Sequence, residues 1–145
     1  MTPEQSQECR RLAGEFRDAE KKLARSRSKL IEADKAVQLA QGRLTEAQNL
    51  LEHIIDQIVA NAQSGVGCAI DLARRTGDKR DCIDVAIKLS GLRVARQRKV
   101  DEQRRDLEDA KLARQAAQDK VDFARNDLDR LRSAVERGGC LSFLQ

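Results

Sequence analysis

The chain has 145 residues, of which 36% are charged and only 2% aromatic, with neither Trp nor Tyr. This lack of bulky side chains excludes a compact globular core, and a composition dominated by Ala, Leu and charged residues is typical of long helices. The net charge is +4, but 28 basic residues are interleaved with 24 acidic ones, which favours an ion-paired, solvated surface over a nucleic-acid groove.

The sequence predicts a first helix over residues 3–61. Thr2 is a favourable N-cap residue, and Pro3 is favourable at the first helical position. Gln5 can complete a capping box with Thr2. Every seventh residue that follows is apolar: Cys9, Phe16, Leu23, Leu30, Val37, Leu44, Leu51 and Ile58. Most residues three positions later are small, so the pattern is a heptad seam with large side chains at a and mostly alanine at d.

Residues 62–78 interrupt the heptads and predict a tip. Ser64-Gly65-Val66-Gly67 is expected to end the first helix, and Cys68–Arg75 to form a short helix that Thr76-Gly77 ends. Asp78 then stands where an N-cap belongs, before a second long helix over residues 79–137. Gly138-Gly139 predicts a left-handed stop, after which residues 138–145 form an apolar tail.

The two seams are complementary in size when the second helix folds back on the first. In an antiparallel pair, residues whose numbers sum to 147 face each other, and most such pairs join a large side chain to a small one. Leu23 then faces Ala124, and Ala47 faces Val100. We therefore expect one all-α domain over residues 1–145: a long antiparallel two-helix coiled-coil hairpin with a short helix at its tip.

The four cysteines fit the same register. Cys9 would meet Cys140 at the open end, and Cys68 would meet Cys82 at the tip; of three possible pairings, only this one is compatible with the hairpin. Disulfides imply the periplasm, secretion, or a virion or cell surface. The alternative is four reduced thiols in a cytoplasmic protein. The spacing of the cysteines is not that of a zinc site, and we expect neither a metal nor a cofactor.

Residues with catalytic potential are scarce. The only histidine, His53, falls on the outer face, away from any nucleophile, so we expect no catalytic residues and no enzyme. Arg93, Arg96 and Arg114 occupy seam positions, from which their guanidinium groups are expected to reach water or carboxylates such as Glu52 and Asp56. Polar seam residues such as Ser26 and Gln103 help to fix the register of such pairs.

Partner binding is the function that the remaining residues favour. A basic set covers the tip and the band behind it: Arg74, Arg75, Lys79, Arg80, Arg93, Arg96, Arg98 and Lys99. An outward apolar set comprises Leu39, Leu112, Phe123 and Phe143. These sets favour a protein partner, self-association, or both; an anionic membrane surface is an open alternative, although no stretch is long and apolar enough to span a bilayer. No aromatic residue is interleaved with the basic band for base stacking, which argues against nucleic acid.

The favoured function is therefore a non-enzymatic, exported coiled-coil adaptor or spacer that binds a protein through its tip, basic band or outer apolar residues. In size, basic pI and long-hairpin architecture, the chain is similar to the small coiled-coil stalk proteins of type III and flagellar export ATPases. That resemblance implies the second hypothesis, a cytosolic stalk or chaperone. A nucleic-acid-binding rod, which rests on charge alone, is the third.

Overall fold

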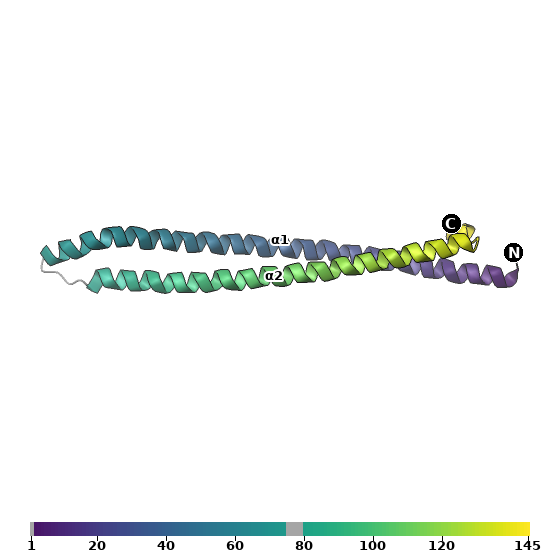
Figure 1. Cartoon of the computed structure of the whole chain (residues 1–145), viewed down its shortest axis with the longest axis horizontal. Helices are drawn as coiled ribbons and strands as arrows, with labels where there is room; N and C mark the ends of the chain where they lie inside the picture. The colour runs from purple at the N-terminus through teal and green to yellow at the C-terminus, as the bar shows by residue number, and fades with distance from the viewer. Residues whose placement is uncertain (1, 75–79) are drawn as a thin grey trace. The chain divides into compact units, whose positions relative to one another are not determined.

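A computed structural model describes the backbone of residues 2–74 and 80–145, and the side chains of residues 2–62 and 83–145. Two long helices, α1 (Pro3–Arg74) and α2 (Arg80–Arg137), are followed by a short 3₁₀ helix, η1 (Leu141–Leu144). The chain divides into unit 1 (Met1–Val37 and Ala110–Gln145) and unit 2 (Gln38–Asp109). In each unit α1 and α2 run antiparallel and pack together (Figure 1), which confirms the predicted helical hairpin.

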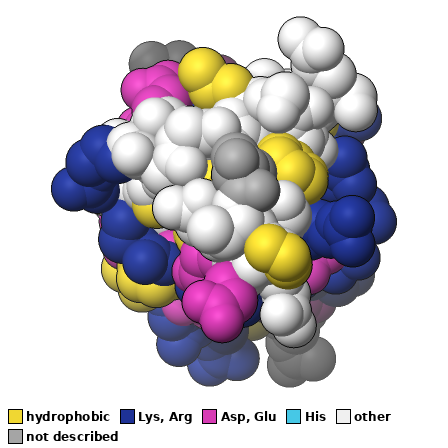
Figure 2. Space-filling model, turned by 90° about the vertical axis from the view of Figure 1, so that its right-hand side faces the viewer, with side chains coloured by type: hydrophobic (Ala, Val, Ile, Leu, Met, Phe, Trp, Pro, Cys, Tyr) yellow, Lys and Arg dark blue, Asp and Glu magenta, His cyan; other side chains and the backbone are white. Residues whose placement is uncertain are grey.

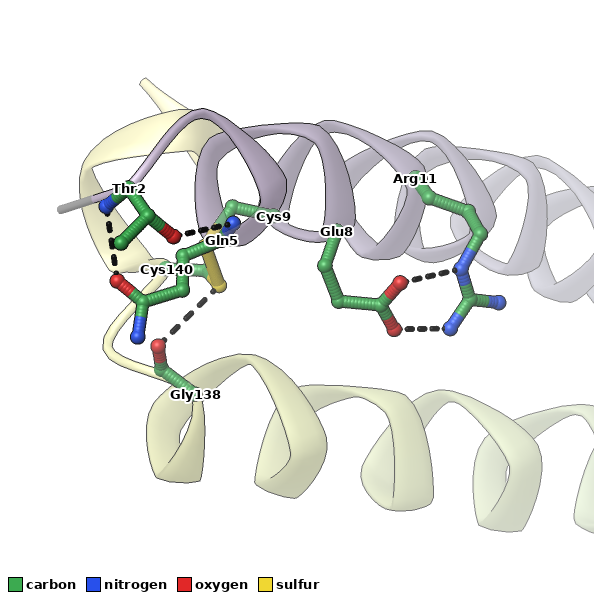
Figure 3. The surroundings of a disulfide bond; sticks show 7 residues. All are labelled: Thr2, Gln5, Glu8, Cys9, Arg11, Gly138 and Cys140. Atoms are coloured by element: carbon green, nitrogen blue, oxygen red, sulfur yellow. Dashed lines mark hydrogen bonds and ion pairs between the residues drawn. A yellow bond between two sulfur atoms is a disulfide. The ribbon is translucent and has the colours of Figure 1, made fainter.

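Helix α1 begins with the predicted capping box. The Gln5 backbone N–H donates to the Thr2 hydroxyl at 3.2 Å, and the Thr2 N–H donates to the Gln5 side-chain oxygen at 2.9 Å (Figure 3). Two otherwise unpaired backbone donors are thereby satisfied. One turn further along, the Arg11 guanidinium bonds Glu8 and lowers the pKa of that exposed carboxyl below its ordinary value.

The core of unit 1 is the predicted seam, in which large side chains of one helix face small side chains of the other. Phe16, Ala19 and Leu23 of α1 form one buried cluster with α2 residues, among them Ala124 and Leu128. The members of this cluster follow the register in which facing residue numbers sum to 147. Small residues opposite large ones let the helix axes approach closely while the seam stays filled. The guanidinium of Arg132 also lies over the Phe16 ring, 5.8 Å from its centroid.

Helix α2 ends in a Schellman turn that positions Cys140. Gly139 has a positive φ of 68°, the Gly139 N–H donates to the Glu136 carbonyl, and the Cys140 N–H donates to the Val135 carbonyl at 2.9 Å. This hydrogen-bond pattern is the one that closes a helix through a left-handed glycine. It turns the chain back so that Cys140 packs with Val135 and Cys9.

The predicted disulfide between Cys9 and Cys140 is present, with the two Cα atoms 5.1 Å apart (Figure 3). Both cysteines are only 2% exposed, so the bond lies within the packed end of unit 1. The Cys140 sulfur is also 3.5 Å from the Gly138 carbonyl oxygen. The second predicted pair, Cys68 and Cys82, lies outside the residues whose side chains the structure describes.

The apolar C-terminal tail that the sequence predicts packs back onto unit 1. Phe143 and Leu144 pack against the Cys9–Val135–Cys140 cluster, and Leu144 also contacts the neighbouring core cluster. Arg17 donates a hydrogen bond to the Phe143 carbonyl oxygen at 3.1 Å. Phe143 therefore does not belong to the outward apolar set. Figure 2 looks at the end that carries both termini, where hydrophobic side chains form small separate areas among backbone, charged and other side chains.

Unit 2 also has a core between α1 and α2. Its buried residues come from both helices: Ala40, Leu44, Ala47 and Ile54 from α1, and Val100, Gln103 and Leu107 from α2. Ala40 and Leu107, like Ala47 and Val100, are pairs that the antiparallel register predicts to face each other. Gln103 is the one polar member of this buried set, and its side-chain Oε1 has no hydrogen-bond partner.

The end of α1 differs from the prediction. The sequence suggests a stop at Ser64–Gly67, but the helix continues through these residues to Arg74, so the Cys68–Arg75 segment does not begin a separate short helix. A glycine in a helix interior lowers the stability of the helix by about 1 kcal/mol relative to alanine. Gly65 and Gly67 nevertheless keep their backbone N–H groups, so neither removes a helical hydrogen bond as proline would. Glycine alone is therefore a weak stop signal. The predicted start of the second helix at residue 79 differs from the observed Arg80 by one residue.

Candidate partner-binding grooves

The structure gives each unit a groove between α1 and α2 in which exposed apolar side chains lie among cations. We call the groove in unit 1 the Phe123 groove and that in unit 2 the Gln103 groove. Their volumes are about 580 and 500 Å³. Both are open troughs between two helices, a geometry that suits an elongated occupant better than a small molecule enclosed on all sides.

The Gln103 groove combines part of the predicted basic band with apolar residues. Leu50 is 43% exposed and Leu92 is 44% exposed, and the two are contributed by different helices. The complete lining is Arg43, Glu46, Ala47, Leu50, Leu92, Ala95, Arg96, Lys99 and Gln103. Three cations and one carboxylate make this groove positive.

The cations of the Gln103 groove have little competition from this chain's own carboxylates. Within the described part of the chain, no ion pair engages Arg43 or Arg96, and Lys99 only approaches Glu102 at 3.7 Å. Both members of that last pair are more than half exposed, so water screens it and its contribution to stability is small. Arg43 and Arg96 are therefore available to form ion pairs with an anionic group that enters the groove.

The Phe123 groove is built on the most exposed large apolar residue that the structure describes. Phe123 is 76% exposed and stands beside Ala124, near the buried seam. The groove is lined by Lys22, Arg25, Ser26, Lys29, Asp119, Lys120, Phe123, Ala124 and Asp127. The two carboxylates already have partners, because Asp119 accepts a hydrogen bond from Gln115 and Asp127 pairs with Arg130.

The other predicted site residues fall outside these grooves. Arg93 and Arg98 are exposed, whereas Arg96 of the Gln103 groove is half-buried. Leu39 and Leu112 are 57% and 70% exposed, as their outer heptad positions predict. The side chains of Arg74, Arg75, Lys79 and Arg80 lie outside the described residues, so the predicted tip surface is not described.

Arg114 pairs with a carboxylate, one of the two outcomes that the sequence predicts for the seam arginines. Its partner is Asp34, on the other helix of unit 1. This pairing follows from the register, because Arg114 faces Ala33 in the seam and Asp34 is the next residue. Both side chains are more than 40% exposed, so the pair contributes little to stability.

The sequence missed the cations of the Phe123 groove. Lys22, Lys29 and Lys120 flank the seam at g positions, and Arg25 lies at c. Their heptad positions were sufficient to group them beside Phe123. A basic cluster is recognised in a sequence from neighbouring residues, whereas this cluster forms across two helices.

Other kinds of site are not seen in the described residues. There, no group of three or more His, Cys, Asp or Glu side chains is placed to bind a metal. No described helix combines enough length with enough apolar character to cross a membrane. His53 is exposed and its ring lies 3.3 Å from the Gln57 side-chain amide, so it contributes to neither groove.

In comparisons with family models, with curated proteins and with solved structures, nothing matches this chain.

Proposed function

We propose that the protein is a non-enzymatic, exported coiled-coil adaptor that binds an acidic segment of a partner protein in the Gln103 groove. The observation that carries this proposal is that exposed Leu50 and Leu92 lie beside Arg43 and Arg96, two cations that form no ion pair with any residue the structure describes. Exposed apolar side chains supply the area that binding removes from water, and the cations select the charge of the partner.

The groove favours a helical partner over other protein segments. It lies between two helices that already pack along a heptad seam, so a third amphipathic helix extends the same packing. Such a helix would place apolar residues against Leu50, Ala47 and Leu92, and carboxylates at its flanks. The flanking carboxylates would then meet Arg43 on one side and Arg96 or Lys99 on the other.

Export is the second part of the proposal, and the Cys9–Cys140 bond supports it. Disulfides persist in oxidising compartments and are rare where glutathione and thioredoxin keep thiols reduced. A two-helix pair has a small core, which makes a covalent link between its ends especially valuable for stability. The non-enzymatic part rests on the scarcity of catalytic residue types, since the chain holds a single histidine.

The binding proposal is tested with a synthetic, end-blocked helical peptide of about 18 residues, long enough to be measurably helical in water. Leucine occupies its seam positions and glutamate the flanking ones; a matched peptide carries glutamine in place of glutamate. The titration is followed through the methyl signals of Leu50 and Leu92 in NMR spectra of the intact, oxidised protein. We expect saturable shifts of these signals with the acidic peptide and weaker binding of the neutral one.

Charge-reversal variants then distinguish binding in the Gln103 groove from non-specific attraction of an acidic peptide to a basic protein. The variant R43E/R96E is expected to weaken binding about tenfold or more, because each reversal replaces an attraction with a repulsion. The matched control K88E/R105E changes the net charge equally, at exposed cations outside the groove. Equal weakening by both variants, or no shift of Leu50 and Leu92, would rule out the proposed site.

A further inference from the structure

We infer that the Phe123 groove of unit 1 is a second, independent docking site, which takes an acidic amphipathic helix with an apolar residue against Phe123. The Phe123 groove shares no lining residue with the Gln103 groove, so binding in one does not require binding in the other. An exposed aromatic ring, cations that form no ion pair within the described residues, and the concave shape of the site together favour a partner there.

The exposed ring of Phe123 offers apolar surface that a partner can cover. Phe123 is 76% exposed, and an aromatic side chain buries about 150–250 Å² when a partner covers it. Ala124, beside it in the groove, is buried in the seam and offers a flat apolar floor. Isolated exposed apolar residues are ordinary, but one that lines a groove with a buried neighbour provides an anchor point for a partner.

The charges of the groove are its second relevant feature. Among the described residues, no ion pair engages Lys22, Arg25, Lys29 or Lys120, which all line the groove. Asp119 and Asp127 are already occupied by Gln115 and Arg130. Four cations against two carboxylates leave a positive groove around the ring. A partner with flanking Asp or Glu residues complements this arrangement, whereas a basic partner is repelled.

The spacing indicates what kind of acidic partner fits. Lys22 and Lys29 are seven residues apart on one helix, about 10 Å along its axis at 1.5 Å per residue. Carboxylates two turns apart on a partner helix match this interval, with a leucine or aromatic side chain between them reaching Phe123. The groove therefore takes about two turns of helix.

Two other anionic ligands fit less well. A membrane surface is flat on this scale, whereas the ring lies in a trough between two helices. A single-stranded nucleic acid binds through successive stacked bases and a regular row of phosphates. This groove has one ring, and two carboxylates interrupt its cations. Vesicles of phosphatidylserine and a single-stranded DNA oligonucleotide are therefore competitors in the test.

The experiment uses the intact, oxidised protein carrying R43E/R96E, so that the Gln103 groove does not obscure the result. The acidic peptide described above is titrated, and binding is followed both by calorimetry and through the ring signals of Phe123 in NMR spectra. We expect saturable binding with shifts of the ring signals. F123A, whose dissociation constant is read by calorimetry, and K22E/K29E are each expected to weaken binding about tenfold or more.

Matched controls lie in the same unit. L112A removes an apolar side chain that is 70% exposed but does not line the groove, and K21E/K35E reverses two other exposed lysines. Neither control is expected to change the dissociation constant more than twofold. Apart from the half-buried Arg96 of the background, all the substituted side chains are exposed. Thermal unfolding checks that each variant stays folded.

Four results would overturn the inference. The first is an absence of binding, and the second is equal weakening by the groove variants and their controls. The third is tighter, Phe123-dependent binding of the vesicles or the oligonucleotide. The fourth is a peptide complex that forms only when the protein self-associates. Because the background lacks a working Gln103 groove, failure here leaves the proposed function unaffected, and failure of the proposed function leaves this site standing.

Discussion

Gln103 shows how a single polar side chain in a thin seam affects both packing and stability. It is only 6% exposed, and its Oε1 has no hydrogen-bond partner. An unpaired buried acceptor costs about 1–3 kcal/mol, because the group loses its water without replacement. Leu44, opposite it in the register, has no hydrogen-bonding side-chain group to offer.

Replacing Gln103 with leucine is therefore expected to stabilise the protein. Q103L removes the unpaired acceptor while keeping most of the side-chain volume, so we expect the free energy of unfolding to rise by about 1–2 kcal/mol. Chemical denaturation of the oxidised protein measures the change. The matched substitution Q97L, on the exposed face of the same helix, should stay within about 0.5 kcal/mol. A destabilised Q103L would show that the amide is satisfied in solution.

At the residue level, the sequence predicted the contacts that local rules or the heptad register determine, and missed those that neither determines. The Thr2–Gln5 capping box involves neighbouring residues and was predicted correctly. For Arg114 the sequence predicts water or a carboxylate, and which carboxylate it meets depends on side-chain conformations across the helix pair. Phe143 was assigned to the surface because no periodic pattern reports how a short C-terminal segment folds back.

Among the elements, the end of α2 is the most specifically encoded. Only glycine adopts a positive φ without steric penalty, and Gly139 sits at that conformation in the turn that brings Cys140 to Cys9. The two glycines before Cys140 therefore do more than stop a helix. They direct the chain toward the disulfide.

Two glycine-to-alanine substitutions in unit 1 are expected to have opposite effects. G139A forces alanine into the left-handed region and should destabilise the protein by about 1–2 kcal/mol. G14A adds a methyl group to open space in the interior of α1 and should stabilise it by about 0.5–1 kcal/mol. Thermal unfolding of both variants compares them directly. Stabilisation by G139A would contradict the left-handed turn.

Helix ends also show the limit of reading elements from sequence. The predicted break at Ser64–Gly67 relied on glycine as a stop signal, but α1 continues to Arg74. A helix that is already nucleated gains a backbone hydrogen bond for each added residue, which offsets the intrinsic penalty of glycine. At Gly138-Gly139, by contrast, the following Cys140 has its own packing partners, and the helix stops.

At the scale of the whole molecule, the apolar a positions from Cys9 to Ile58 pack against the second helix of the same chain. The alanines of one helix face the large residues of the other in each unit, and Cys9 is bonded to a residue 131 positions away. In the chain-entropy model, closing a loop of that length stabilises the folded state by about 4–5 kcal/mol. Fold class and this disulfide were both predictable, because two independent features of the sequence indicate the same antiparallel register. One is the pairing of large with small seam residues, and the other is the positions of the cysteines.

Disulfide mapping of protein purified from its native source, without reductant and with free thiols blocked at lysis, tests the account most directly. A non-reduced digest of monomeric protein should contain the Cys9 peptide linked to the Cys140 peptide, and neither cysteine should carry the blocking group. That result supports both the internal antiparallel register and an oxidising compartment. Blocked Cys9 and Cys140, or a Cys9–Cys9 link between two chains, would contradict the disulfide-clamped, exported hairpin.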